Sequence, residues 1–253
     1  MLWVYARSIF YGGNTMELWS QVKDNLWFLL ICGLIAASLF CLAKLAQHFL
    51  PNLRTTTPAR RISIIGICAA IATVLHMLDF PLLFLAPDFY KVDFSELPVL
   101  LSGFYLGPTA TVACEGIKIV LKLLFKGTST AFVGDFANFA VGCSLVLPAT
   151  IIYHAHKSKH SAVIGLVVGC LSMSIFGSAF NAIYLLPKFA QLYGIALEAI
   201  IGMGTKINGN IHNVTTFVMI CVAPLNLLKS SVVSVLTLLL YKRVARPLFG
   251  RKP

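Results

Sequence analysis

Long apolar runs separated by short polar stretches occupy most of the chain between Leu26 and Tyr241. Several of these runs reach or exceed the roughly 20 residues that a helix needs to cross a bilayer. The third run breaks at "LGPT" (Leu106–Thr109), too early to cross squarely, so we expect a half-length or tilted helix there. The pattern predicts seven helical spans, near Leu26–Ala46, Ile62–Leu85, Leu97–Gly107, Thr109–Phe125, Phe132–Tyr153, Ser161–Leu186 and, for the last, a run that ends near Tyr241.

A largely polar stretch with two prolines, Pro51–Arg60, separates the first span from the others. The first span could be a cleaved signal peptide, but it lacks a convincing small-x-small site and arginines follow it, which favours a membrane anchor. We therefore predict an all-α integral membrane protein with a six-helix core and one extra N-terminal transmembrane helix. Its parts are an N-terminal extension (residues 1–55), a six-helix membrane domain (56–246) and a basic cytoplasmic tail (247–253).

The composition supports a membrane protein and argues against nucleic-acid binding. Hydrophobic residues make up 58% of the chain and charged residues 11%, about half the charge of a typical soluble domain. The net charge of +11 comes mostly from basic residues at the ends of apolar runs, where topology explains them better than DNA or RNA does. The seven cysteines form no CxxC pair, so we interpret them as packing residues and expect no metal site.

Three basic stretches set the expected orientation: Leu53–Arg61, His154–His160 and Tyr241–Lys252, none of which contains an acid. The opposite loops hold Asp88, Asp93, Glu96 and Glu198. With seven spans the basic stretches all fall on one side, which predicts a multi-pass membrane protein with its N-terminus outside and its C-terminus in the cytoplasm. The long Lys188–His212 loop would then lie over the outer face.

Polar groups inside a membrane are costly and usually face a cavity or a partner. The loop "DFPLLFLAPDFYKVDFSE" (Asp79–Glu96) is either an interfacial aromatic belt or a lid over a ligand. In "FKGTSTAFVGDFAN", Ser129 or Thr130 could cap a helix whose dipole favours Asp135. Helix capping does not explain Asn138, which lies three residues further on and on the same face as Asp135.

Two further clusters lie in the last two spans. "FNAIYLLP" carries Asn181, which could serve an interhelical hydrogen bond, and Tyr184, which alone would be an ordinary interface aromatic. "CVAPLNLLKSS" contains Pro224, which we expect to start or kink the last helix, followed by Asn226 and Lys229 on one face. Lys229 could snorkel, pair with Asp135 or Glu115, or bind a ligand.

These groups suggest a class of ligand. Asparagine amides offer a donor and an acceptor, and an ammonium offers three donors. Together they suit a neutral, planar solute rich in hydrogen-bonding groups better than an anion, which calls for arginines, or a cation, which calls for carboxylates.

The residues that carry these clusters also resemble a known family. "VDFSELPVLLSGFYLGP", "KGTSTAFVGDFANFAVGCSLVLPA", "FNAIYLLP" and "APLNLLKSSVVSVLTLLLYKR" are similar, in order and spacing, to the riboflavin-specific substrate-binding subunit (S component) of energy-coupling-factor (ECF) transporters, over about Arg60 to Lys242. The resemblance implies a six-helix domain in a prokaryotic cell membrane that binds riboflavin from outside, with its phosphate ester FMN as a second candidate ligand. Asp135 departs from the glutamate expected in the family.

The resemblance also implies roles for individual residues. The substrate-binding residues would be Asn181, Asn226, Lys229, Asp135, Asn138, Gly127, Thr128, Ser129, Thr130 and Tyr184. The lid residues would be Leu78, Phe80, Leu83, Phe84 and Leu85. The residues that dock on a membrane coupling subunit would be Gly66, Ala69, Ala70 and Thr73.

Uptake would need that coupling subunit and two ATPase subunits, because the chain has no GxxxxGK[ST] loop. Riboflavin would be the transported ligand, and we expect no cofactor. The alternatives are an S component for another vitamin, a stand-alone facilitator, and an intramembrane enzyme using Lys229, Asp135 or the histidines of "HAHKSKH". We expect a solvated basic loop at those histidines, and no enzyme activity.

Overall fold

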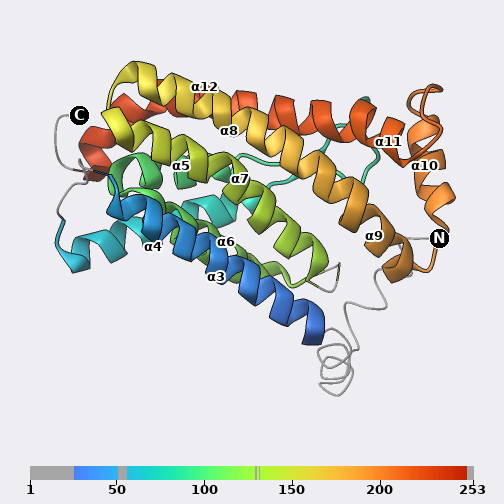
Figure 1. Cartoon of the computed structure of the whole chain (residues 1–253), viewed down its shortest axis with the longest axis horizontal. Coiled ribbons are helices and arrows are strands. Elements are labelled where there is room, and N and C mark those ends of the chain that lie inside the picture. Colours follow the sequence, from blue (N-terminus) through green and yellow to red (C-terminus); the bar gives the residue numbers. More distant parts are fainter. Residues whose placement is uncertain (1–25, 51–55, 129, 131, 250–253) are drawn as a thin grey trace.

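The computed structural model describes residues 26–50, 56–128, 130 and 132–249, and these form a helical bundle (Figure 1). The helices are α3 (Leu26–His48), α4 (Pro58–Met77), α5 (Glu96–Leu106), α6 (Pro108–Lys126), α7 (Val133–His156), α8 (Lys159–Phe180), α9 (Leu186–Tyr193), α10 (Leu197–Thr205), α11 (Val214–Phe217) and α12 (Ala223–Phe249). Two π-helical turns, η1 (Asn181–Leu185) and η2 (Val218–Val222), join α8 to α9 and α11 to α12. A two-stranded antiparallel hairpin, β1 (Phe80–Pro81) and β2 (Lys91–Val92), lies between α4 and α5.

Within the described residues, five continuous helical segments are long and apolar enough to cross a membrane: Leu30–His48, Pro58–Met77, Val133–His156, Lys159–Tyr193 and Val214–Tyr241. Helix α5 has 11 residues, about 16 Å at 1.5 Å per residue, so the short third run is confirmed as a half-length helix. Two expected boundaries were wrong. The second span ends at Met77 because the residues up to Leu85 enter the hairpin segment, and the sixth continues through η1 to Tyr193.

The two π turns explain how the helices pass prolines without breaking. Pro187 follows η1 and Pro224 follows η2, and each proline lacks the N–H that would continue the helical hydrogen-bond ladder. A π turn absorbs one extra residue and rearranges the ladder locally. Pro224 therefore neither starts nor ends the last helical segment, which is continuous from Val214. The turns also set the directions in which Asn181 and Asn226 point.

The extra helix α3 packs along α6 and α7 (Figure 1). At its C-terminal end, the Gln47 side-chain oxygen accepts hydrogen bonds from the Thr109 backbone N–H (3.2 Å) and hydroxyl (2.5 Å). Arg61 of α4 also donates to the Thr109 hydroxyl. An N–H in the first turn of α6, which has no partner within its own helix, is thus satisfied by the N-terminal extension.

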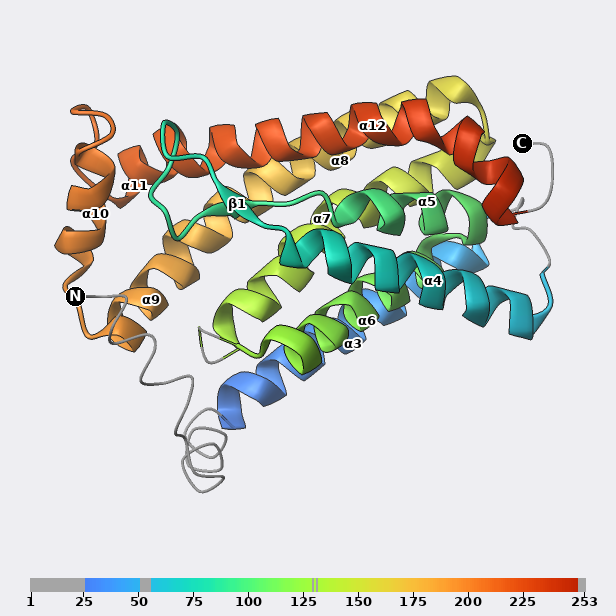
Figure 2. The same ribbon diagram turned by 180° about the vertical axis from the view of Figure 1, so that it is seen from behind.

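The hairpin segment, residues 78–95, lies at the same end of the bundle as α9, α10 and α11 (Figure 2). Its residues Ala86 and Val92 share a buried apolar cluster with Ile200, Ile211 and Phe217. The α9–α11 region, which includes most of the long Lys188–His212 stretch, therefore packs directly against the hairpin segment. Together they close one end of the bundle.

Among the described helices, α7 and α8 make the most extensive contact, and glycines let their backbones approach. A Cβ on Gly169 would lie 2.5 Å from the backbone carbonyl oxygen of Leu145, and one on Gly165 would lie 2.6 Å from that of Ala149. Backbone atoms cannot rotate away as a flexible side chain can. Small residues at such positions are typical of membrane helix interfaces.

We predict that Gly169→Ala destabilises the protein by about 1–3 kcal/mol, because the added methyl group forces α7 and α8 apart. Thermal unfolding in detergent measures the effect. Gly33→Ala on α3 is the control, since a Cβ there meets nothing within 4 Å. Equal unfolding temperatures for the two variants would contradict the close approach.

Candidate functional site

A cavity of about 310 Å³ lies between the hairpin segment, α7, η1 and α12. Its volume is at the lower end of the range of small-molecule sites. It is lined from six directions: His76 of α4; Asp79, Phe89, Tyr90, Lys91, Asp93 and Glu96 of the hairpin segment and the start of α5; Lys122 of α6; Thr130, Gly134, Asp135, Ala137, Asn138, Val141 and Gly142 around α7; Met173, Asn181, Leu185, Phe189 and Tyr193 of α8–α9; and Val222, Leu225, Asn226 and Lys229 of the last helical segment.

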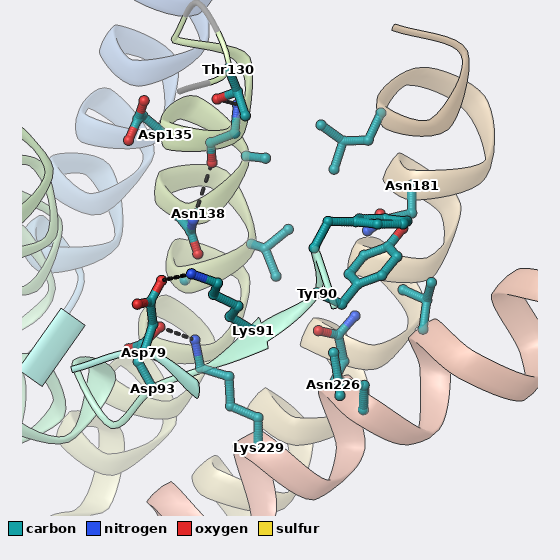
Figure 3. Close-up of a pocket in the computed structure, with 18 of the residues that line it drawn as sticks. Asp79, Tyr90, Lys91, Asp93, Thr130, Asp135, Asn138, Asn181, Asn226 and Lys229 are labelled. Atoms are coloured by element: carbon teal, nitrogen blue, oxygen red, sulfur yellow. Dashed lines mark hydrogen bonds and ion pairs between the residues drawn. The ribbon is translucent and has the colours of Figure 1, made fainter. Parts of the chain in front are cut away.

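Asn181 of η1 and Asn226 of α12 lie on the same side of this cavity, beside Tyr90 (Figure 3). Both side chains lie against Gly177 of α8. The Asn181 amide donates to the Gly177 carbonyl (2.7 Å), and its oxygen accepts from the Tyr90 hydroxyl (2.6 Å). Within the described part of the chain, the buried Nδ2 of Asn226 has no hydrogen-bond partner. A buried donor left without a partner costs roughly 1–3 kcal/mol, so the Asn226 side chain would gain from a partner that a bound molecule supplies.

Tyr90 covers the cavity from the hairpin segment. Its ring lies 4.7 Å from that of Phe89 and 6.2 Å from that of Phe217, measured between centroids. Burial raises the pKa of Tyr90, so its hydroxyl stays protonated and donates to Asn181. The hydrogen bond holds the hairpin segment on the cavity, and a ligand that takes the Asn181 oxygen must displace it.

Lys229 is buried and held by two acids. Its ammonium donates to Asp93 Oδ2 (3.1 Å) and to Glu96 Oε1 (3.0 Å). His76 Nδ1 also lies 3.2 Å from Asp93 Oδ2. Burial opposes ionisation of Asp93, but the nearby Lys229 and His76 hold the pKa of its carboxyl well below its usual range. The ion pair considered for Lys229 is therefore present, but its partners are Asp93 and Glu96 and not Asp135 or Glu115.

The start of α7 forms the opposite wall. Lys122 donates to Asp135 Oδ1 (2.5 Å) and to the Gly127 carbonyl (3.0 Å), which ties the end of α6 to the first turn of α7. The Asn138 amide donates back to the Gly134 carbonyl (3.1 Å), and the Thr130 hydroxyl accepts from the Gly134 N–H (2.9 Å). In Figure 3 the Asp135 carboxylate points away from the two asparagines.

Six of the expected substrate-binding residues line the cavity together: Asn181, Asn226, Lys229, Asp135, Asn138 and Thr130. Gly127 and Thr128 instead shape the loop before α7: Gly127 takes a positive φ of 69°, and the Thr128 hydroxyl accepts from the Phe132 N–H. Ser129 lies outside the described residues. Tyr184 does not line the cavity, because η1 turns its ring onto Phe180, 5.4 Å away.

The residues expected to form the lid do not border the cavity. None of the five residues expected to form it, Leu78, Phe80, Leu83, Phe84 and Leu85, lines the cavity. Leu83 and Phe84 are instead 61% and 74% exposed. The hairpin turn places them on its outer surface and directs the later residues Phe89, Tyr90 and Lys91 inward.

Sequence reasoning missed the ionic partners of Lys229. The sequence shows Asp93 and Glu96 as acids in an outer loop that is either an aromatic belt or a lid, and gives them no role beside Lys229. They lie 136 and 133 residues from Lys229 along the chain, so no local spacing connects them.

The family model described as "ECF transporter, substrate-specific component" matches residues 60–241. The chain belongs to this family.

Two relatives of the S component carry names that describe a substrate. This chain is 33% identical over 186 residues to "Riboflavin transporter RibU" of Staphylococcus aureus (strain TCH60), and the match covers 74% of this chain and 90% of the relative. It is 29% identical over 184 residues to "Riboflavin transporter FmnP" of Bacillus subtilis (strain 168), covering 72% and 90%.

A solved structure described as "Structure and mechanism of the S component of a bacterial ECF transporter" matches with a TM-score of 0.59 and 33% identity. The match covers 99% of that chain and 76% of this one. Family, relatives and fold agree that this S component is a multi-pass membrane transport protein and not an enzyme.

We predict that Lys229→Met lowers the free energy of unfolding by about 3–5 kcal/mol, because it leaves Asp93 and Glu96 buried beside too little positive charge. Lys126→Met is the control. Lys126 also pairs with an acid, Asp79 at 3.0 Å, but its side chain is 42% exposed, so its loss should cost less than about 1 kcal/mol. Chemical unfolding in detergent measures both losses. Equal losses of stability in the two variants would contradict the buried network.

Proposed function

We propose that this S component binds riboflavin from outside the cell and delivers it to an ECF-type importer. The observation that carries the proposal is Asn226, which lines the cavity and whose buried Nδ2 has no hydrogen-bond partner among the described residues. The pyrimidine edge of the flavin ring alternates hydrogen-bond acceptors with a donor, which matches the two amides. The 33% identity to a protein named for riboflavin transport supports the same ligand.

The cavity offers each part of such a ligand a suitable wall. Asn181 and Asn226 face the edge of the ring, while Tyr90 and Phe89 offer aromatic surface for its face. Lys229 can donate to a carbonyl oxygen or ring nitrogen of the flavin, or to a ribityl hydroxyl. The three lysines that line the cavity, Lys91, Lys122 and Lys229, all have carboxylate partners, as an uncharged ligand requires.

The orientation follows from the basic residues. Helix α12 ends at the opposite end of the bundle from the hairpin segment (Figure 2). The basic stretch that begins at Tyr241 starts within this end of α12. Because positively charged loops stay in the cytoplasm, we assign the cavity end to the outside and the end of α12 to the inside. The N-terminus is then outside and the C-terminus is cytoplasmic.

Riboflavin titration of the purified protein tests the function directly, by quenching of flavin fluorescence. We predict that Asn226→Ala weakens binding by at least about tenfold, roughly 1.4 kcal/mol, because the ligand loses a buried partner. The folded protein should not lose stability, since the unpaired donor disappears. Asn210→Ala, in the loop outside the cavity, is the control. Unchanged affinity of Asn226→Ala would remove the basis of the proposal, and competition by FMN would show whether a phosphate is tolerated.

Delivery would require a membrane coupling subunit and two ATPase subunits. We propose that Gly66 and Ala70 form the docking surface for the coupling subunit, because both are exposed on α4 beside Ile62, Ile67 and Ile71. Ala69 and Thr73, which we had included, are 0% and 3% exposed and pack inside the bundle. They support α4 from within and cannot touch a partner.

We predict that Gly66→Trp leaves riboflavin affinity unchanged and lowers capture by the coupling subunit at least about tenfold, because a large side chain keeps the helices apart. Ile175→Trp is the control, on a lipid-facing surface of α8 where Ile175 is 71% exposed. Co-purification of the assembled transporter measures capture. Equal capture of both variants would place the docking surface elsewhere.

Vesicles that hold this protein alone should bind riboflavin without transporting it, and flux through them would favour a facilitator.

A further inference from the structure

A second buried lysine, Lys118 on α6, lies behind the cavity wall. Its side chain is 0% exposed and does not line the cavity. The ammonium donates to Glu115 Oε1 (2.5 Å) and to Ser95 Oγ (3.0 Å), and it lies 3.6 Å from Glu96 Oε1. Glu96 Oε1 is the same atom that accepts from Lys229. The two lysines are therefore connected through one carboxylate oxygen.

The arrangement leaves one donor of Lys229 for a ligand. An ammonium has three N–H groups. Asp93 and Glu96 take two of them, and Lys229 borders the cavity. The positions of these two acids thus determine where the third N–H points. A change in either acid turns the donor away from a bound molecule.

Charge balance shows what Lys118 contributes. Asp93, Glu96 and Glu115 are three carboxylates, and Lys118 and Lys229 are two ammonium groups, with His76 beside Asp93. Without Lys118, one ammonium would face three buried carboxylates, and buried charge without a partner is strongly unfavourable. Lys229 would be drawn further toward Glu96 and Glu115, away from the cavity.

We propose that Lys118 is a positioning residue for ligand recognition. It neutralises Glu115 and shares Glu96, so that Lys229 keeps one N–H directed at an acceptor of an uncharged ligand. The inference rests on the proposed function and adds a residue that touches no ligand. Glu115 fits this role sterically because it lies over Gly142, where a Cβ would be 2.3 Å from Glu115 Oε1.

The test compares riboflavin affinity of the wild type with that of Lys118→Met, Glu115→Gln and the double variant. We expect Lys118→Met to weaken binding at least about tenfold, because it removes one partner of a buried charge pair. The double variant removes both charges, and we expect it to bind within about threefold of the wild type. Lys126→Met, an exposed lysine on the same helix, should bind as the wild type does.

A pH series separates positioning from a structural role. In Lys118→Met the surplus carboxylate should take up a proton as the pH falls from about 8 to about 6, and affinity should recover, since burial favours the neutral acid. The wild type should change less over this range. The groups that face the network in the described part of the chain are His76 of α4, Asp93 before α5, Glu96 of α5, Cys114 and Glu115 of α6, Cys143 of α7 and Lys229 of α12.

The outcomes are distinguishable. A wild type that does not bind riboflavin would overturn the proposed function and this inference together. Wild-type binding that Lys118→Met retains would overturn the inference alone. Loss of binding in Lys118→Met without rescue in the double variant, or unfolding of both, would show a structural role and also overturn it. Unfolding of Lys118→Met with a folded, binding double variant would support it.

Discussion

The structure depends on a buried ammonium group held between two carboxylates. Lys229 of α12 joins Asp93 of the hairpin segment and Glu96 of α5, and Glu96 continues through Lys118 to Glu115 of α6. Charges in a low-dielectric interior are tolerated only when they are paired, so these elements cannot separate independently. The network thereby makes one wall of the cavity from segments that lie far apart along the chain.

This constraint connects fold and recognition. The ionic wall fixes Lys229 on one side, the Lys122–Asp135 pair fixes the start of α7 on the other, and two π turns direct the asparagines between them. Because the charges are largely matched within the protein, the cavity presents donors and acceptors with little net field, as a neutral polar solute requires. The hairpin segment also places the Tyr90 hydroxyl in this space, where it donates to Asn181, and a ligand that takes the Asn181 oxygen can replace this hydrogen bond.

The N-terminal extension sets this S component apart from the solved structure that it matches, since 99% of that chain aligns with 76% of this one. Helix α3 satisfies a backbone N–H at the start of α6 through Gln47 and packs along α6 and α7. It thus covers a side of the bundle away from the exposed small residues of α4. Gly66 and Ala70 of α4 remain exposed with α3 in place.

The sequence by itself determined the fold class, the half-length third helix and a set of candidate polar residues. Six of these residues line one cavity in the structure: Asn181, Asn226, Lys229, Asp135, Asn138 and Thr130. Apolar run length and the high cost of polar groups in lipid are local properties, which is why they can be recognised in a single chain. Only the tertiary structure decided the partners of Lys229, the inward direction of Tyr90, the outward direction of Leu83 and Phe84, and the burial of Ala69 and Thr73. These depend on which helices meet and on how a hairpin turns, and ion pairs between residues more than 130 positions apart leave no periodic signal.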